Sequence, residues 1–570
     1  MSLNSTSIPE NAFANGLADN ISSIVSTPES IDALRKLIVS FALAGRFSKS
    51  AASEQSPAEL LDETQMNHGK YGNHGNRKQP IREQLPVSPE ELPHEGLSHL
   101  SWTRLSAVCE VEKGNTPILK AVAGPFPLVT TGEQRGSHSD YQFDADAVIV
   151  PLVSSTGHGH ASLKRLHFQA GRFALGNILC AIIPRNSEVL SARFLYEFLS
   201  AYKDELLVSR MSGTANVSLT INKVLDVPIP IISVDAQKRV CELMGLCDEL
   251  AERQAAQREK RQRLVGATLD RLVSTRNPAE FPTQAHRLRD HFNQLFDTPT
   301  TIPQLRQTIL QLAVQGQLVP QDPDDEPASE LLERVRMECV DTSDDGEEID
   351  EALDSTNENH GPQLEQPASW KLVRFADIIT YGPRNGISPK PVQHVTKTKS
   401  LTLSATTSGT FDGRHVKYLT EEFPADSFLW LRDGDILIQR SNSEHYVGVA
   451  AIYRGKLNDF VYPDLMMKVR VASCIDVAFA HLILMSPPSR AYFRTRATGT
   501  SGSMRKINKT TVKTLPFPLP PLSEQKRIVA KVTELLSLCD ALEAKLTQAE
   551  SASTQLLSAA VHHLLHNSPS

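Results

Sequence analysis

The sequence lacks the features that would place the chain in a membrane or outside the cell. It has no uninterrupted apolar run long enough to cross a bilayer, and no basic stretch followed by an apolar segment at its N-terminus. Its seven cysteines form no Cys-x-x-Cys pair and no regular framework, which is typical of buried, reduced thiols. We therefore expect a cytoplasmic protein with no membrane partner.

The common catalytic motifs are also missing. The sequence contains no Gly-x-x-x-x-Gly-Lys-Ser/Thr loop for ATP and no Gly-x-Ser-x-Gly elbow. The stretch "SPPS" (486–489) resembles the Pro-Pro-aromatic signature of amino-methyltransferases, but its fourth residue is not aromatic. His158 and His160 share a glycine-rich loop without further ligands at zinc spacing. We expect no catalytic residue, no bound cofactor and no metal on this chain.

Charge is distributed unevenly behind a net charge of −7. Residues 322–366 hold 17 Asp and Glu against 2 Lys and Arg, whereas residues 367–521 hold 21 Lys and Arg against 11 Asp and Glu. Residues 101–232 are nearly neutral, with 12 basic and 11 acidic side chains. Because a phosphate backbone responds to local charge, the basic stretch is compatible with a polyanionic partner despite the acidic total.

The sequence repeats itself. "TINKVLDVPIPIISVDAQKRV" (220–240) and "KINKTTVKTLPFPLPPLSEQKRI" (506–528) share Ile-Asn-Lys, a proline-alternating stretch and Gln-Lys-Arg. "TPESIDALRKLIVSFALAGRF" (27–47) likewise matches "TPTTIPQLRQTILQLAVQGQL" (298–318), and the same offset places "ELL" at 59–61 on "ELL" at 330–332. Trp102 then corresponds to Trp370, and "SGTANVSLTINK" (212–223) to "TGTSGSMRKINK" (498–509). This pattern predicts a duplicated module with pseudo-twofold symmetry.

Apolar spacing predicts the secondary structure. Residues 235–274 and 523–565 carry apolar side chains every three or four positions and predict long amphipathic helices, with Asp235 and Ser523 as their starts. Shorter helices are expected over 30–45 and 302–315, ended by Gly45 and Gly316. The runs "DAVIVPLV", "NILCAIIP", "GDILIQRS", "GVAAIYRG" and "MMKVRVA" predict strands. We expect an α/β (α+β) fold with two globules separated by long helices that pair as an antiparallel coiled coil.

The domain boundaries follow from these patterns. The predicted segments are an N-terminal helical segment (1–61), a flexible linker (62–100), a first globule (101–232), a central helical region (233–335), an acidic flexible linker (336–366), a second globule (367–521) and a C-terminal helix (522–570). From Lys-Arg to Cys-Asp the central helix takes eight steps (239–247) and the C-terminal helix takes twelve (527–539). A difference of four residues is about one helical turn, or about 6 Å, and largely keeps the buried face.

Taken together, these stretches resemble the DNA-specificity subunit of type I restriction–modification enzymes. The resemblance rests on "LRQTILQLAVQGQLVPQDPDDEPASELLERV" (305–335), "GNTP" (114–117) and above all "LPFPLPPLSEQKRIVAKVTELLSLCDALEAKL" (515–546). It covers nearly the whole chain from about residue 27, with both halves present. The "GNTP" of the first globule has no clean counterpart in "YGPRNGISPK" (381–390), so we expect the two globules to recognise different sequences.

The resemblance implies a function and partners. In such subunits each globule is a target recognition domain that reads one half of a bipartite, asymmetric site on double-stranded DNA. The helices fix the spacing of the half-sites and hold two methyltransferase subunits, which bind S-adenosylmethionine; restriction subunits, which are nuclease–translocases that use ATP and Mg²⁺, join that core. We further hypothesise that the length of these helices sets the half-site separation.

Base-reading side chains are expected in polar loops of both globules. In the first globule the predicted DNA-binding residues are Lys113, Asn115, Thr116, Arg135, Ser154, Thr156 and Lys164, and in the second Arg384, Asn385, Lys397, Lys399, Arg440, Asn442, Lys506 and Lys509. Arg440 and Asn442 have the side-chain types that read guanine and adenine, although Arg440 would equally suit an ion pair with Asp433. The recurring pairs Thr214/Thr500, Asn222/Asn508 and Lys223/Lys509 are either phosphate contacts or structural closures of each globule.

Two other classes of function remain open at this point. A coiled-coil adaptor whose globules bind proteins would explain the helices and the acidic linker, but not the duplicated globules or the basic second half. The remaining possibility, an enzyme with an unfamiliar active site, has only negative support, because it rests on the absence of the known catalytic motifs. A methyltransferase partner that carries the Pro-Pro-aromatic motif would favour the DNA-recognition function.

Overall fold

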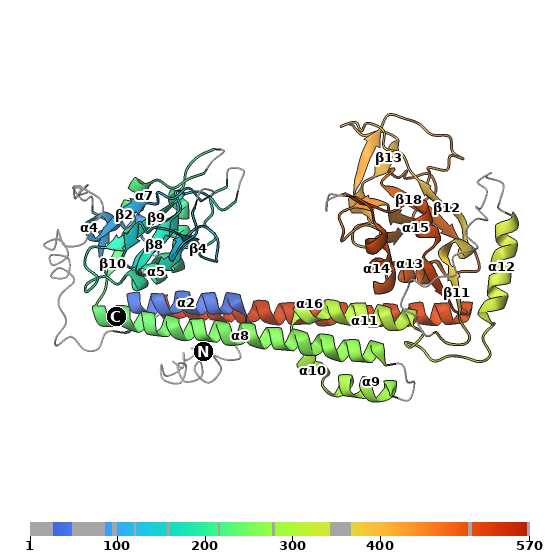
Figure 1. Cartoon of the computed structure of the whole chain (residues 1–570), viewed down its shortest axis with the longest axis horizontal. Helices are drawn as coiled ribbons and strands as arrows, with labels where there is room; N and C mark the ends of the chain where they lie inside the picture. Colours follow the sequence, from blue (N-terminus) through green and yellow to red (C-terminus); the bar gives the residue numbers. More distant parts are fainter. Residues whose placement is uncertain are drawn as a thin grey trace, which may run out of the picture. The chain divides into compact units, whose positions relative to one another are not determined.

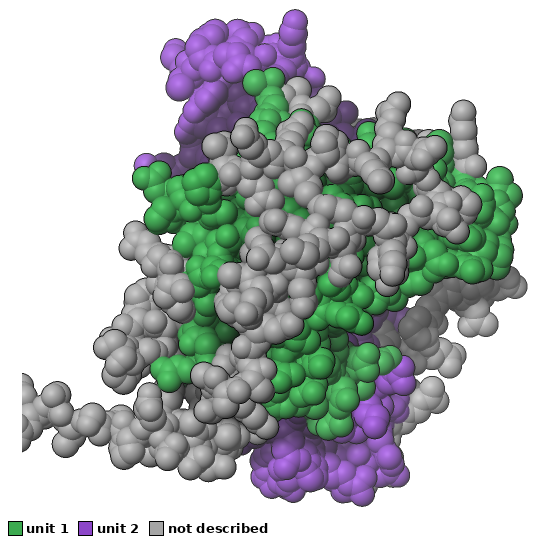
Figure 2. All heavy atoms as spheres, turned by 90° about the vertical axis from the view of Figure 1, so that its left-hand side faces the viewer, with its two compact units in different colours: residues 1–259, 548–570 green, residues 260–547 purple. Residues whose placement is uncertain are grey.

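The computed structural model describes residues 25, 27–47, 86–93, 100–118, 121–156, 160–214, 217–275, 280–341, 366–499 and 504–566. The chain divides into two compact units, residues 1–259 with 548–570 and residues 260–547 (Figure 2). Each unit contains one globule and parts of the long helices, and the units are described separately below. No helix of the described residues is long and apolar enough to cross a membrane.

The first globule is closed by its own two ends. Strand β1 (Ser101–Arg104) pairs antiparallel with β10 (Pro228–Ile231), so that Trp102 lies opposite Pro230. In an antiparallel ladder only alternate residues donate N–H groups to the partner strand, and a proline at every second position leaves that ladder intact. This explains the alternating prolines of the sequence, which recur in strand β20 (Pro516–Leu519) paired with β11 (Lys371–Arg374) of the second globule.

A four-stranded antiparallel sheet forms the centre of the first globule (Figure 1). Its order is β2 (Cys109–Lys113), β9 (Leu179–Pro184), β6 (Ala147–Pro151) and β7 (His167–Gln169). A second sheet has the order β4 (Gly136–His138), β3 (Phe126–Val129), β8 (Arg172–Leu175) and β5 (Phe143–Asp144). The helical elements are η1 (Pro89–Glu91), α4 (Leu105–Val108), α5 (Ala192–Ala201), α6 (Lys203–Leu206), η4 (Val208–Arg210) and α7 (Ile221–Leu225).

The second globule repeats the central sheet. Its order is β12 (Ile379–Asn385), β18 (Met466–Val471), β15 (Ile436–Gln439) and β17 (Ala450–Ile452), again antiparallel throughout. Two further pairs are β13 (Thr398–Leu401) with β14 (Val416–Leu419), and β16 (Ser441–Asn442) with β19 (Arg505–Lys506). The helical elements are η7 (Phe375–Ile378), η8 (Leu403–Ala405), α13 (Val477–Met485), α14 (Pro487–Arg496) and α15 (Lys509–Lys513). All five strands predicted from the sequence lie in the two central sheets.

The remaining elements are helices outside the globules: α2 (Pro28–Leu43), α8 (Val234–Ser274), α9 (Phe281–Asp290), α10 (Phe292–Leu295), η5 (Pro299–Thr301), α11 (Ile302–Val314), α12 (Ala328–Asp341) and α16 (Leu522–His566). The four helices predicted from the sequence are confirmed, with Gly45 and Gly316 at positive φ just after α2 and α11. The predicted starts are wrong, because α8 begins at Val234 and α16 at Leu522. In α8 the hydroxyl of Ser233 accepts the N–H of Ala236, a capping contact that leaves Asp235 inside the first turn.

A buried glutamine anchors each long helix to its globule. The side-chain oxygen of Gln237 accepts the backbone N–H of Ser191, the cap of α5, at 2.9 Å, and that of Gln525 accepts the N–H of Asp476, the cap of α13, at 2.9 Å. The Gln237 amide also donates to two backbone oxygens and the Gln525 amide to one. These are the glutamines of the two Gln-Lys-Arg motifs, which therefore join the exit of a globule to its helix.

Matching ion pairs tie the shorter helices to the long ones. Arg35 of α2 contacts Asp248 of α8 at 2.6 Å, and Arg306 of α11 contacts Asp540 of α16 at 2.5 Å. The anchoring glutamine and this aspartate are 11 residues apart in α8 (237 and 248) and 15 apart in α16 (525 and 540). The extra helical turn seen in the sequence thus lies between two equivalent contacts. The antiparallel coiled coil itself stays a prediction.

Two alignments made from the sequence letters need correction. Strand pairing makes Leu372, not Trp370, the counterpart of Trp102, because Leu372 lies opposite Pro518 as Trp102 lies opposite Pro230. Trp370 instead donates its indole N–H to the buried Glu524 at 3.0 Å. The "ELL" match at 59–61 lies outside the described residues.

Candidate nucleic-acid interface

The two Ile-Asn-Lys motifs are not at equivalent positions. Thr220 caps α7 by accepting the N–H of Lys223, whereas Asn508 caps α15 by accepting the N–H of Thr511. The equivalent caps are therefore 288 residues apart (220 and 508), and the matching letters are displaced from them by two residues. Asn508 therefore has a structural role as a helix cap, and a phosphate contact at this residue stays a prediction. Thr500 lies outside the described residues.

Backbone hydrogen bonds define the same corner in both globules. The N–H of Leu152 donates to Ile178 at 2.9 Å, and the N–H of Arg440 donates to Leu465 at 2.8 Å. The oxygen of Leu152 accepts the N–H of Leu219, as the oxygen of Arg440 accepts that of Ile507. One residue later, the bridge from Val153 to Ser218 corresponds to the pairing of Ser441 with Lys506. The segment that follows β6 therefore contacts the segment before α7 in the same way as the segment that follows β15 contacts the segment before α15.

Three of the second globule's predicted residues, Asn385, Arg440 and Lys506, lie at this corner. Met467 of β18 pairs with Asn385 on one side and Ile438 on the other, which places Asn385 and Arg440 at the same end of the sheet. Arg440 donates to the backbone oxygen of Asp464 at 3.5 Å, and Lys506 is exposed on β19. The alternative ion pair of Arg440 with Asp433 is wrong, since Asp433 pairs with Arg454 at 3.0 Å.

The other predicted residues of the second globule have protein partners. Arg384 stacks on the ring of Phe428 with 3.6 Å between its guanidinium carbon and the ring centroid. Lys397 and Lys399 belong to the β13 region and contact Glu422 and Asp459, at 3.6 and 2.9 Å. Asn442 donates its amide to Gln439 at 2.7 Å. Lys509 opens α15 and also has an interaction within the chain.

The predicted residues of the first globule lie in different parts of it. Lys113 ends β2 at the corner, with Ser154 and Thr156 in the adjoining loop, where both hydroxyls bond the backbone oxygen of His160. Lys164 is exposed, and the backbone N–H of Asn115 donates to Gln142.

Two predicted residues of the first globule, the buried Thr116 and the exposed Arg135, have partners within the fold. Thr116 is buried at 5 % exposure, and its backbone bonds both Leu175 and Asn177, which does not fit a direct contact with DNA. Arg135 contacts Gln169, the ring of His167 and two backbone oxygens. Burial and the charges of Arg135 and Arg165 lower the pKa of His167 to about 4. Both residues contact their surroundings in this conformation, and their role in DNA binding stays a prediction.

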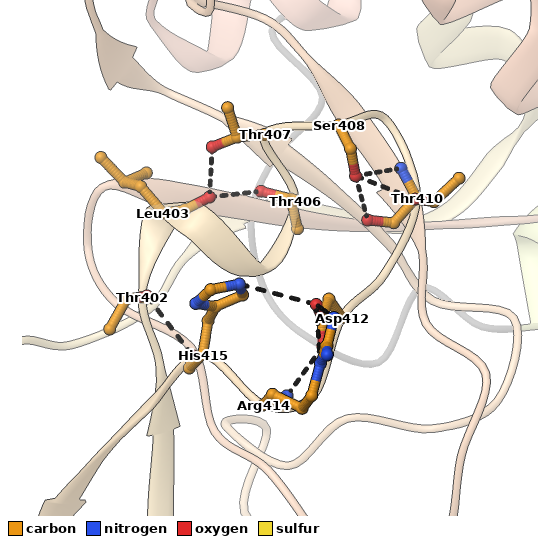
Figure 3. Close-up of polar contacts among 9 residues, drawn as sticks. All are labelled: Thr402, Leu403, Thr406, Thr407, Ser408, Thr410, Asp412, Arg414 and His415. Atoms are coloured by element: carbon orange, nitrogen blue, oxygen red, sulfur yellow. Dashed lines mark hydrogen bonds and ion pairs between the residues drawn. The ribbon is translucent and has the colours of Figure 1, made fainter. Parts of the chain in front are cut away.

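A polar loop between β13 and β14 was missed by the sequence analysis. Figure 3 shows Arg414 and His415 directed at the carboxylate of Asp412, which Arg414 contacts at 2.7 Å and His415 at 3.5 Å. Hydrogen bonds from Arg414 lower the pKa of Asp412. Because Arg414 is 88 % exposed, a fixed guanidinium is presented to solvent from this loop. In the sequence, the only sign of this contact is that Arg414 and His415 follow Asp412 within three residues.

The described residues hold no cluster that would bind a metal ion. Within the described ranges, no group of three or more His, Cys, Asp or Glu side chains has a geometry that would hold a metal ion. His158, one of the histidines noted in the sequence, lies outside those ranges. What the arrangement offers chemically is hydrogen-bond donors and acceptors on two similar corners, which suits recognition rather than bond making.

Comparisons with known proteins agree with this interpretation. The family described as type I restriction modification DNA specificity domain matches the chain twice, over residues 101–255 and 367–550. The EcoEI specificity subunit of Escherichia coli is 25 % identical over 564 residues, covering 93 % of each chain. The EcoAI specificity subunit of Escherichia coli is 26 % identical over 545 residues, covering 90 % of each. A solved HsdS subunit from Thermoanaerobacter tengcongensis has a TM-score of 0.34 at 16 % identity, covering 84 % of this chain and 99 % of that one. The chain belongs to the family of type I restriction modification DNA specificity domains.

Proposed function

We propose that this chain is the DNA-recognition subunit of a type I restriction–modification complex. Each globule contacts one half of a bipartite, asymmetric site, and the chain itself makes and breaks no covalent bond. The observation that carries the proposal is the pair of globules with one sheet order and one corner geometry but different side chains there. Two copies of one binding surface that carry different side chains suit a target with two different halves.

The long helices have the second role in this proposal. They separate the globules and provide the surface on which two methyltransferase subunits bind, with restriction subunits completing the complex in the cytoplasm. S-adenosylmethionine, ATP and Mg²⁺ belong to those partners. Equivalent contacts at the two ends of each helical segment support a spacer role, because the glutamine fixes a globule to its long helix and the arginine fixes a shorter helix to it. The additional turn in α16 supports helix length as the determinant of half-site separation.

The decisive experiment is methylation mapping in a host without its own DNA methylation. The chain is expressed with its neighbouring methyltransferase subunit, and single-molecule sequencing identifies modified adenines. We expect one split, asymmetric motif that disappears when this chain is omitted. An active methyltransferase that co-purifies with the chain but leaves no such motif would favour the protein-binding adaptor instead. Failure of the methyltransferase to bind at all would contradict the proposed partnership.

A further inference from the structure

A shallow pocket lies at the corner of the first globule. Its polar lining includes Lys113, Asn177, Ser218 and Asn222, together with Thr220, whose hydroxyl caps α7, and its apolar floor includes Leu152. Among the described residues, the side-chain polar groups of the first four of these lining residues bond no other group, although each can donate a hydrogen bond. One ammonium, two amides and one hydroxyl thus surround an apolar floor without satisfying one another. Such a combination is typical of a site that orients a polar, planar ligand.

The same positions in the second globule carry different side chains. Asn385 occupies the position of Lys113. Lys113 lies opposite Cys180 of β9, which also pairs with strand β6. Asn385 lies opposite Met467 of β18, which also pairs with strand β15, the equivalent of β6. Arg440 replaces Leu152 and Lys506 replaces Ser218, as the backbone contacts above establish.

Two further replacements complete the set. Asp464 replaces Asn177, because each stands two residues before its β-strand, β18 or β9. Thr510 replaces Asn222, because each follows the first residue of its short helix, α15 or α7. We name the two sets the sheet-corner sites, consisting of Lys113, Leu152, Asn177, Ser218 and Asn222 in the first globule, and Asn385, Arg440, Asp464, Lys506 and Thr510 in the second.

Within the described residues, one polar atom of the second sheet-corner site and one of the adjoining Ser441 have no hydrogen-bond partner. The Oδ1 atom of Asn385 and the Oγ atom of Ser441 are buried and have no hydrogen-bond partner, and Ser441 is only 1 % exposed. Buried polar atoms without partners cost folding free energy, so native proteins keep few of them, and each calls for an explanation such as a bound water, an ion or a functional contact. Both atoms belong to the strand ends that form this corner.

The charges indicate which part of DNA is bound. Arg440 and Lys506 are cations, but the carboxylate of Asp464 lies in the same site and would repel a phosphate. A carboxylate accepts hydrogen bonds from the amino group of cytosine, while arginine and asparagine bond the edges of guanine and adenine. A mixed set of donors and acceptors therefore suits base edges better than the phosphate backbone.

The geometry points to the sheet-corner sites as the base-reading sites of the two recognition domains, with their five differing side chains responsible for the different half-sites. This assignment rests on the proposed function and adds to it the place where specificity is encoded. Arg440 with Asn385 and Asp464 selects base pairs by hydrogen bonds. In the first globule, Lys113 with Asn177 and Asn222 does so beside the apolar floor at Leu152, which suits contact with a thymine methyl group.

The test uses the complex of the full chain and its methyltransferase partner, with the wild-type methylation motif mapped first. Arg440→Gln is expected to relax one position in one half-site by about ten- to a hundredfold in preference, leaving the other half and the spacer unchanged. Asn177→Asp is expected to change the opposite half only. Lys506→Gln provides a second exposed position in the second globule should Arg440→Gln fold poorly, as judged by co-purification.

Matched controls are Lys417→Gln on β14 and Lys203→Gln on α6, exposed or partly exposed lysines outside both sites, which should leave the motif intact. If the wild-type motif exists but every corner variant keeps it at all positions, the assignment is overturned while the proposed function stands. A uniform loss of methylation on all sequences, with a weaker salt dependence, would also overturn it, because that pattern belongs to phosphate contacts. Absence of any wild-type motif would instead contradict the proposed function itself.

Discussion

The centres of the two globules differ although their sheets have one order. Val148 pairs with Ile182 in the first sheet and Ile436 with Val469 in the second, so the preceding residues are also equivalent. These are the alanines at 147 and 181 in the first globule, but Asp435 and Lys468 in the second, and all four are at most 1 % exposed. An apolar pair and an ionic pair thus occupy the same place in one topology.

The ionic pair has a structural task that the alanines do not. Lys468 donates to the backbone oxygens of Phe428 and Trp430, the latter at 2.9 Å, and lies 3.8 Å from Asp435. Burial lowers the pKa of Lys468 to about 8. The buried cation therefore fastens the segment that precedes β15 to the sheet. Since buried ion pairs seldom add net stability, the difference teaches that the repeated backbone sets the topology while each interior serves its own loops.

Removing the acid of this pair should produce the largest effect. Asp435→Ala leaves Lys468 and Arg470 without their carboxylate, and we expect the free energy of unfolding of the second globule to fall by about 3–5 kcal/mol. Hydrogen exchange of β15 and β18 peptides measures the loss, with β6 and β9 as the internal control. The double variant Asp435→Ala/Lys468→Ala, which imitates the first globule, should lose less than the sum of the single variants. Additive losses would contradict the coupling.

Removing either anchoring glutamine should lower the stability of its own unit by a similar, intermediate amount, which tests whether the two glutamines are equivalent. Gln237→Ala and Gln525→Ala each leave a backbone N–H and at least one oxygen without a partner inside the fold. We expect each to destabilise its own unit by about 2 kcal/mol. Faster hydrogen exchange should appear at the start of α5 for the first variant and of α13 for the second. Gln257→Ala, an exposed position on α8, is the control; losses confined to one unit would show that only one glutamine is an anchor.

A pH response should distinguish the globules. His167 is neutral in the folded first globule because its pKa is about 4, whereas an unfolded histidine titrates near 6.5. The unfolded state therefore binds more protons, so the contribution of His167 to stability is complete above about pH 6.5 and falls, by roughly 2–3 kcal/mol, as pH drops toward 4. The second globule has Ala451 at this place, because Leu437 pairs with Ala451 as Ile149 pairs with His167.

Denaturant unfolding of His167→Gln at several pH values checks this expectation. Glutamine keeps a neutral acceptor for Arg135, which contacts the ring of His167 at 3.2 Å, but it does not titrate. The loss of stability in the first unit between pH 6.5 and 4 should therefore be smaller in the variant than in the wild type. An identical pH profile in both would show that other groups cause the loss.

Local patterns in the sequence were sufficient to predict the strands and the helices. The five strand runs are mainly apolar over strands of three to six residues, and the helices keep one apolar stripe over many turns, so burial reinforces the local preference. The proline alternation correctly marked the exit of each globule, because it fits only a strand whose missing N–H groups face away from the partner.

Equivalent positions and side-chain partners were not predictable in the same way. Strand β12 has irregular register between Ile379 and Arg384, which moves Asn385 into the place of Lys113 without any trace in a letter-by-letter alignment. The hairpin before α15 is two residues longer than that before α7, and this misplaced the Ile-Asn-Lys match. The partner of Arg440 depends on chain segments far apart in the sequence, and only the folded structure brings them together.

The pairing of β1 with β10, and of β11 with β20, has a consequence for how such a chain can change. Each globule leaves its helices and returns to them through neighbouring residues of one short ladder, with Ser101 opposite Ile231 and Lys371 opposite Leu519. The residues between the two strands of a ladder form an insert whose first and last residues are held next to each other. An insert that keeps these ends and the backbone groups bound by the anchoring glutamine can replace another without a change in the helices, and the exchange takes one genetic crossover at each end of the insert.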